Sequence, residues 1–145
     1  MTNSITTKPP VWFWIIAVVA LIWNAMGVMQ YLGQAYETES FRSQYTAEQL
    51  EIISSTPAWA TAAFAIAVFF GLLASLSLLL KKKFAYTLFL LSLLGIIVQL
   101  YHNLIVVESV DIYGPAAAIM SAMILVFGIL LLLFSKYAIK KGWLN

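Results

Sequence analysis

The chain has 145 residues, of which 63% are hydrophobic and only 10% are charged. A soluble domain is roughly half apolar and a quarter charged, so this chain has too few charges to cover a water-facing surface. It also has no cysteine, which excludes disulfides, thiolate metal sites and cysteine nucleophiles. The composition therefore excludes a soluble protein and predicts a polytopic membrane protein.

Four long apolar runs occupy residues 11–32, 57–80, 84–107 and 115–135. None of them contains Asp, Glu, Lys or Arg, and about 20 helical residues are enough to cross the hydrocarbon core of a bilayer. Backbone polar groups in lipid must be bonded within their own segment, so these runs should be helices. We predict an all-α fold in which residues 1–145 form one domain, an antiparallel four-helix transmembrane bundle.

The connection at residues 33–56 is long for a helix hairpin and contains a helix start signal. Thr46 and Gln49 have the spacing of a capping box, in which each side chain bonds the backbone N–H of the other residue. Leu50, Ile52 and Ile53 follow. We predict a short helix at about residues 47–54, which serves as a structured connector or as a lid.

The charged residues separate by sign along the chain. With four crossings, all seven lysines fall on one side of the membrane and all six acidic residues fall on the other, together with Arg42. Loops on the cytoplasmic side carry an excess of Lys and Arg. This pattern predicts that both termini are cytoplasmic. The lysines are Lys8, Lys81, Lys82, Lys83, Lys136, Lys140 and Lys141, and the acids are Glu37, Glu39, Glu48, Glu51, Glu108 and Asp111.

Small residues recur at intervals of four in two of the apolar runs. They are Ala63, Ala67, Gly71 and Ser75 in the second run, and Ala118 and Ala122 in the fourth. Small side chains at this spacing let the backbone of another helix approach closely. We expect these residues to pack against helices of the same chain or to form the contact of a homo-oligomer.

Polar residues gather in the outer halves of the apolar runs. A helix rises about 1.5 Å per residue, which places Asn24, Gln99 and Ser121 at a similar depth. His102 and Asn103 continue the stripe that holds Gln99, and Trp23 lies near the midplane. Two interpretations remain open. The polar groups either join helices by hydrogen bonds or line an outward-facing pocket for a small neutral solute, made by Trp23, Asn24, Gln99, His102, Asn103 and Ser121.

The sequence offers no set of residues typical of an enzyme. His102 is the single histidine, and only Glu108 and Asp111 could join it in a metal or acid–base site. No apolar run holds a carboxylate for ion-coupled pumping. The lysines are accounted for by membrane topology, so nucleic acid is not an expected partner. We therefore expect no catalytic residues, no metal and no cofactor.

Three stretches resemble a family of short proteins. Trp23-Asn24 precedes Met26-Gly27, a Thr56-Pro57-Ala58-Trp59 sequence opens an alanine-rich run, and the chain ends with Lys141-Gly142-Trp143-Leu144 before Asn145. These features are similar to a group of short, uncharacterised four-helix membrane proteins of bacteria, some of which carry the label "sugar transporter". The resemblance implies location in the bacterial inner membrane and carries no residue-level mechanism.

Two functions remain open at this point. The chain is expected to bind or pass a small neutral polar solute through an outward-facing pocket, as a homo-oligomer, because four helices are few to enclose a pathway. The alternative is a non-catalytic accessory or structural subunit that associates with another membrane protein through its small-residue faces.

Overall fold

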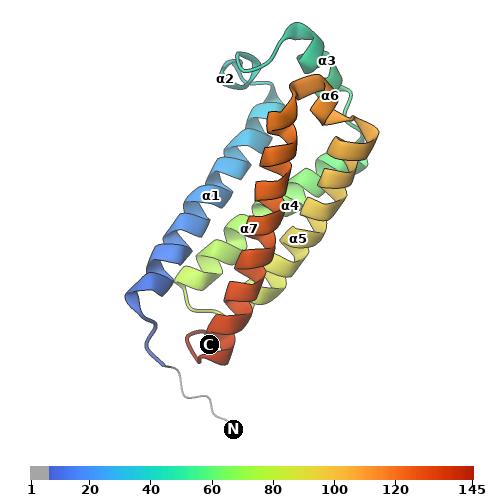
Figure 1. Cartoon of the computed structure of the whole chain (residues 1–145). Coiled ribbons are helices and arrows are strands. Elements are labelled where there is room, and N and C mark those ends of the chain that lie inside the picture. Colours follow the sequence, from blue (N-terminus) through green and yellow to red (C-terminus); the bar gives the residue numbers. More distant parts are fainter. Residues whose placement is uncertain (1–6) are drawn as a thin grey trace.

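The computed structural model describes residues 7–145, and all regular secondary structure in that range is helical. Four segments in this range are long and apolar enough to cross a membrane, which indicates a multi-pass membrane protein: Val11–Tyr36, Ala58–Leu79, Ala85–Val106 and Pro115–Lys140. Figure 1 labels the helices. They are α1 (Val11–Tyr36), α2 (Glu39–Arg42), α3 (Ala47–Ser54), α4 (Ala58–Leu79), α5 (Ala85–Tyr101), a π-helix (His102–Val106), α6 (Ser109–Tyr113) and α7 (Pro115–Lys140).

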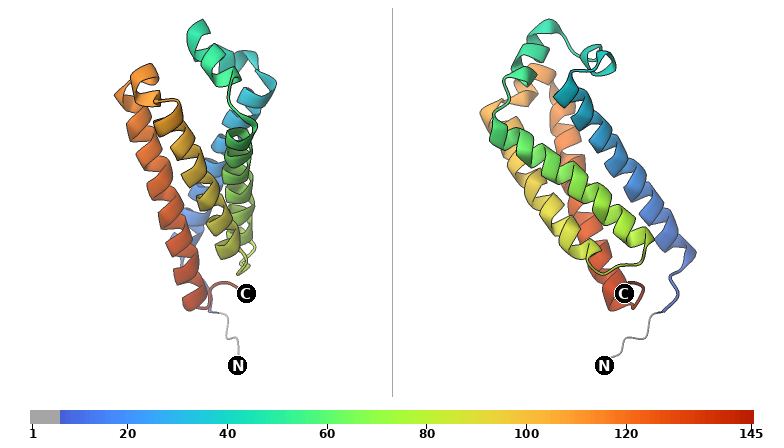
Figure 2. Two further views of the ribbon diagram at one scale, coloured as in Figure 1. Left: turned by 90° about the vertical axis from the view of Figure 1, so that its right-hand side faces the viewer. Right: turned by 180° about the vertical axis from the view of Figure 1, so that it is seen from behind.

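Helix α4 is the centre of the bundle. It packs along α1 on one side and along α5 on the other, and α7 packs mainly on α5 (Figure 1). In the turned view of Figure 2, α1 and α4 diverge from α5 and α7 towards the end of the molecule that carries α3 and α6. The two pairs of helices are therefore close together at one end of the bundle and apart at the other.

The two ends of the bundle differ in construction. At one end, which we call the lysine end, the Lys83 N–H donates to the Asn145 carbonyl at 2.9 Å and the Asn145 N–H donates to the Lys81 carbonyl at 2.7 Å. The Thr7 N–H donates to the Gly142 carbonyl at 2.8 Å, so the C-terminal segment lies between Thr7 and the turn that joins α4 to α5. The opposite end, which we call the loop end, carries residues 37–57 and 107–114 (Figure 1).

Aromatic residues pack together at the lysine end, and of these Phe13 and Trp143 are buried. The Trp143 ring lies 5.2 Å from Trp12, 5.8 Å from Phe13 and 5.5 Å from Tyr137, in edge-to-face geometry. Leu144 beside it is 1% exposed. The C-terminal segment thus belongs to the hydrophobic core rather than to a solvated tail.

Two of the long helices extend beyond the apolar runs that predict them. α1 continues to Tyr36 and α7 continues to Lys140, whereas the apolar runs end at residues 32 and 135. Apolar composition marks the hydrocarbon core, but a helix can continue into the polar region outside it. α1 stops where Glu37 takes a left-handed conformation (φ 49°) and its N–H bonds the Gly33 carbonyl.

The long connection is ordered by helix caps. α3 spans the residues that the capping-box pattern indicates: Thr46 Oγ1 accepts from the Gln49 N–H at 3.1 Å, and Gln49 Oε1 accepts from the Thr46 N–H at 3.0 Å. The four-residue helix α2 is not predicted by the sequence. It starts at Thr38, whose hydroxyl accepts from the Phe41 N–H at 3.2 Å, and Phe41 is buried.

Small residues make the contact between α4 and α5. A Cβ added to Gly95 would lie 2.8 Å from both the Ala63 carbonyl oxygen and the Ala67 nitrogen, so only glycine allows this approach. The Ser92 hydroxyl donates to the Ala67 carbonyl at 2.6 Å across the same contact. The structure buries Ala63, Ala67, Gly71 and Ser75 in this part of the bundle. It leaves Ala118 and Ala122 of α7 exposed, so these two make no packing contact of that kind within the chain.

Gly71→Leu should destabilise the bundle by about 3 kcal/mol through overpacking. A Cβ at Gly71 would overlap the Asn24 amide oxygen and would lie 3.2 Å from the Ser92 hydroxyl, so the larger side chain has no room. The free energy of unfolding measured by SDS titration with circular dichroism tests this. Ala118→Leu is the matched control and should unfold like wild type. Equal stability of both variants would contradict the assigned contact.

Candidate functional site

A cavity of about 400 Å³ lies at the loop end of the bundle. Its wall comes from the end of α1, the connection with α2 and α3, the start of α4, the end of α5 with the π-helix, α6 and the start of α7. The apolar part of the wall is contributed by Phe41, Ile52, Ile53, Ala60, Phe64, Leu100, Val107, Ala116, Ala117, Met120 and Ile124. We call this space the loop-end cavity. Segments far apart in the sequence build it together, so it depends on the tertiary fold.

Four of the six predicted ligand-binding residues line the loop-end cavity: Gln99, His102, Asn103 and Ser121. Gln99 lies one turn beyond Gly95 on α5, and His102 and Asn103 follow it in the π-helix. Ser121 reaches the cavity from α7 and is 8% exposed. The structure thus brings the polar stripe of the third apolar run together with a hydroxyl of the fourth.

The π-helix at His102–Val106 shapes one side of the cavity. The Val107 N–H donates to the His102 carbonyl at 2.9 Å, one residue further along the chain than in an α-helix. His102 is 5% exposed, its ring stands edge-on to Trp59 at 5.4 Å, and its Nδ1 lies 3.3 Å from Asn103 Oδ1. Short π-helical turns are uncommon and are found frequently at functional sites.

Ser109 carries an unsatisfied hydroxyl in the cavity wall. The side chain is 6% exposed, and within residues 7–145 its Oγ is the one buried side-chain polar atom without a hydrogen-bond partner. A buried hydroxyl in this state costs about 1–3 kcal/mol. The preceding residue, Glu108, has φ 55°, a left-handed conformation that is strained for a residue other than glycine. A ligand that bonds Ser109 would recover the cost of the unpaired hydroxyl.

Two tyrosines in the wall remain neutral at physiological pH. Tyr45 and Tyr113 lie with ring centroids 6.0 Å apart, and the Tyr45 oxygen accepts a hydrogen bond from Gln30 Nε2 at 3.1 Å. Burial raises the pKa of Tyr45, and the bond from Gln30 offsets part of this rise. Burial, then the proximity of Tyr45, raises the pKa of Tyr113. Since no Lys, Arg, Asp or Glu lines the cavity, its wall offers hydrogen bonds without formal charge from these groups.

Asn24 and Trp23, the other two predicted ligand-binding residues, lie outside the wall of the loop-end cavity. Asn24 Nδ2 donates to the Ala20 carbonyl at 2.8 Å and to the Ser75 hydroxyl at 3.2 Å, so Asn24 joins α1 to α4. Trp23 packs edge-on against Phe127 of α7 at 4.8 Å. Asn24 thus matches the alternative interpretation, in which a polar residue ties helices together. The rise along a helix gives the depth of a residue but not the direction in which its side chain points.

Sequence reasoning missed several polar residues of the wall, among them Ser109, Tyr45 and Tyr113. Each lies in a connecting segment, where hydropathy marks no membrane depth, and each reaches the cavity only because α6 and the 37–57 connection fold over the bundle. Tyr45 directly precedes Thr46, the first residue of the capping box. This position is the one sequence signal from which Tyr45 could have been predicted to lie next to a helix.

Within residues 7–145, no group of three or more His, Asp or Glu side chains lies together in an arrangement that could hold a metal ion. The chain matches no family model, no curated protein and no solved structure in the three comparisons made. The cavity therefore has to be interpreted from its own geometry.

Cysteine substitution tests the position of the cavity, because the chain has no cysteine of its own. A membrane-impermeant thiol reagent should label Gln99→Cys and Asn103→Cys, which line the loop-end cavity, several times faster than Asn24→Cys, which lies in the α1–α4 contact. Leu131→Cys, which packs on the core near the lysine end, is the second protected control. Uniform labelling rates at all four positions would mean that no such cavity is open to water.

Proposed function

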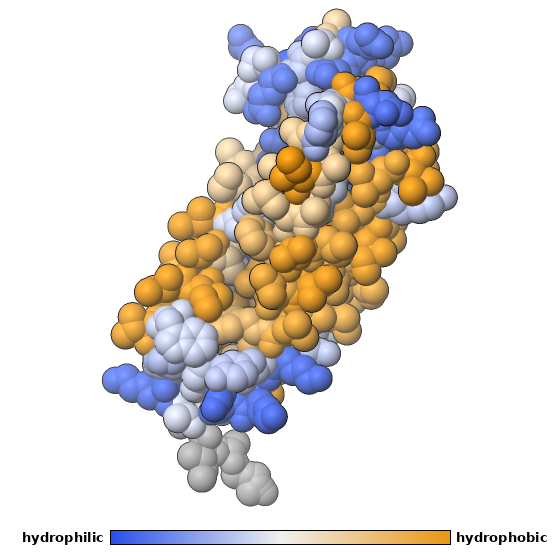
Figure 3. Space-filling model, viewed as in Figure 1, coloured by the Kyte–Doolittle hydropathy of each residue, from blue (hydrophilic) through white to orange (hydrophobic). Residues whose placement is uncertain are grey.

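We propose that the protein is an antiparallel four-helix transmembrane bundle of the bacterial inner membrane with both termini in the cytoplasm. An apolar belt lies between two hydrophilic ends in the space-filling view, which supports a membrane-spanning orientation along the helices (Figure 3). The seven lysines belong to the end where Thr7 bonds Gly142, and the six acidic residues belong to the loop end. This asymmetry supports a cytoplasmic lysine end and an external loop end.

Reporter fusions test this orientation. A fusion after Lys83 and one after Asn145 should both report a cytoplasmic position, whereas a reporter inserted between Glu48 and Gln49 should report an external one. An external position for the fusion at Asn145 would contradict the four-crossing arrangement.

We further propose that the protein binds a small neutral solute in the loop-end cavity from the outer side of the membrane. The observation that carries this proposal is the unpaired, buried hydroxyl of Ser109 in an uncharged cavity of about 400 Å³. Ligand sites usually have volumes of about 300–1,000 Å³ and combine apolar walls with a few polar groups. The cavity has this size and this composition.

The chemistry of the wall favours a solute with both hydroxyl groups and apolar faces. Gln99 and Asn103 can each donate and accept hydrogen bonds, and the hydroxyls of Ser109 and Ser121 can do either. The apolar residues of the wall would contact carbon–hydrogen faces. A charged solute would be buried without a counter-charge, which is costly. Neutral sugars and polyols meet these requirements, in agreement with the "sugar transporter" label that some resembling proteins carry.

Passage of the solute to the other side would require a further conformation. Below the loop-end cavity, Trp23 packs against Phe127, and at the lysine end Phe13 packs against Phe134 at 5.7 Å and against Trp143. These contacts fill the space between α1 and α7. Binding needs only the conformation described here, whereas transport needs the aromatic contacts to separate.

The alternative function is that of an accessory subunit, and one observation favours it. Only 6% of the residues in the most apolar window of α7 are buried in the chain. Ala118 and Ala122 lie on its exposed surface, where a helix of another membrane protein or of a second copy could approach closely. Ala122→Leu separates the two functions: it should leave solute binding unchanged and should weaken association only if this surface contacts protein.

Ser109→Ala tests the binding function, because it should affect stability and solute affinity differently. Removing an unsatisfied hydroxyl should leave the free energy of unfolding unchanged or raise it by about 1 kcal/mol, while the affinity for the solute should fall about tenfold because a hydrogen bond is lost. Thermal midpoints of the purified protein, measured with neutral sugars and polyols, report both effects. Amino sugars and sugar acids of equal size are the matched ligands and should not stabilise the protein.

Asn24→Leu is the matched variant, since Asn24 lies outside the cavity wall and should lose stability without losing the solute response. The proposal fails if no neutral solute raises the thermal midpoint of the wild type. It also fails if Ser109→Ala responds to the solute as the wild type does.

A further inference from the structure

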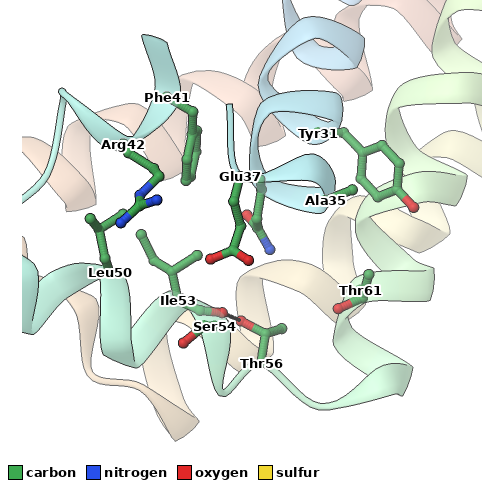
Figure 4. Close-up of a pocket in the computed structure, with 11 residues that line it drawn as sticks. Tyr31, Ala35, Glu37, Phe41, Arg42, Leu50, Ile53, Ser54, Thr56 and Thr61 are labelled. Carbon is green, nitrogen blue, oxygen red and sulfur yellow. Dashed lines mark hydrogen bonds between the residues drawn. The ribbon is translucent and has the colours of Figure 1, made fainter. Parts of the chain in front are cut away.

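A second hollow, of about 300 Å³, lies beside the loop-end cavity and carries charges of both signs. Figure 4 shows its wall, in which Glu37 and Arg42 extend towards the hollow from the connection after α1. Its other polar residues are Tyr31, Gln34, Ser54, Thr56 and Thr61. We call it the charged hollow. It differs in kind from the loop-end cavity, which no Lys, Arg, Asp or Glu lines.

Arg42 is an exception among the cations of the chain. The other seven are lysines, all placed by sequence at the lysine end, and Arg42 is the single cation in the connections of the loop end. Membrane topology explains the lysines but does not explain a cation at this end. A guanidinium presents several N–H donors in a planar fork that matches a phosphate or a carboxylate, which an ammonium group does not.

The backbone fixes the positions of Glu37 and Arg42. The Glu37 N–H and the Thr38 N–H both bond the Gly33 carbonyl, the latter at 3.1 Å, and Thr38 caps α2, which ends at Arg42. Phe41 packs on Gly33, where an added Cβ would lie 2.9 Å from the Phe41 Cβ. The backbone that carries the two charged side chains is therefore short and ordered, while the side chains themselves are exposed and would lose rotamer freedom on binding.

The charges of Glu37 and Arg42 do not satisfy each other. Figure 4 draws no hydrogen bond between the carboxylate and the guanidinium, which lie on different parts of the wall with Ile53 near both. A hollow with a separated negative and positive group is complementary to a ligand that carries the opposite charges at a similar separation.

We propose that the charged hollow binds a zwitterion that has a primary ammonium group and a phosphate or carboxylate group. The ammonium donates to Glu37, and the anionic group accepts from Arg42. Two sources offer this chemistry at the outer surface of a membrane: the headgroup of phosphatidylethanolamine and a free small zwitterion. This inference does not depend on the solute proposed for the loop-end cavity.

Lipid selectivity gives a direct test of each contact. Native mass spectrometry of the detergent-purified protein should detect more one-to-one adduct with phosphatidylethanolamine than with phosphatidylcholine, because the quaternary ammonium of choline has no N–H to donate to Glu37. Glu37→Gln should remove this preference. Arg42→Gln should weaken binding of both lipids about tenfold, since the phosphate contact is common to them.

Soluble compounds distinguish the free zwitterion from the lipid. If the ligand is free, phosphoethanolamine or alanine should raise the thermal midpoint of the wild type but not of Glu37→Gln or Arg42→Gln, and phosphocholine should have little effect. Glu48→Gln and Lys141→Gln are the matched charge controls, because neither residue lines the charged hollow, and both should behave like wild type. The proposal is overturned if the wild type shows neither the lipid preference nor the thermal shift. It is equally overturned if Glu37→Gln and Arg42→Gln retain whichever response the wild type shows.

Discussion

The close approach of α4 and α5 at Gly95 is the contact on which the rest of the structure depends. In lipid, helices gain little from the hydrophobic effect and are held by packing and hydrogen bonds. Gly95 lets α5 approach the backbone at Ala63 and Ala67, and the Ser92 hydroxyl bonds the Ala67 carbonyl across this contact. On its other side α4 receives Asn24 of α1 beside Gly71 and Ser75. α4 therefore joins both neighbours through small or hydroxyl-bearing side chains.

The same contact positions the loop-end cavity. One turn beyond Gly95, Gln99 already faces the cavity, and the π-helix then carries His102 and Asn103 into its wall. α3 lies at the tip of the α1 and α4 pair and α6 at the tip of the α5 and α7 pair, and both contribute residues to the cavity wall (Figure 2). The stretch from His102 to Ser109 contains a π-helical turn, a left-handed Glu108 and an unpaired hydroxyl. Three such departures from optimal local structure in eight residues are typical of a site whose geometry is maintained for function rather than for stability.

The two hollows at the loop end differ in the charges of their walls. The loop-end cavity has none from Lys, Arg, Asp or Glu, whereas the charged hollow next to it holds Glu37 and Arg42. Gln34, Phe41, Ile53 and Thr56 line both spaces and form the boundary between them. The connection at residues 37–57 is ordered by caps at Thr38 and Thr46. Its length is explained by its place between the two hollows, which it keeps apart.

The sequence predicts the four long helices well, because apolar length is a direct requirement of the bilayer. It also groups Gln99, His102 and Asn103, since helical periodicity places them on one stripe. It does not distinguish Asn24 from Gln99, because the rotation of each helix is set by tertiary packing. Ser109 could not be found either, since its burial depends on α6 folding over the bundle. Ala118 and Ala122 show that small-residue spacing alone does not identify a contact within the chain.

The central claim is that a neutral solute occupies the loop-end cavity and bonds Ser109. A crystal structure grown in a lipid mesophase, with a brominated form of the best-binding neutral sugar, tests this most directly through the anomalous signal of bromine. The account predicts one bromine peak inside the loop-end cavity, with a sugar oxygen within hydrogen-bonding distance of Ser109 Oγ. A peak elsewhere on the protein, or an empty cavity at saturating sugar, would contradict it.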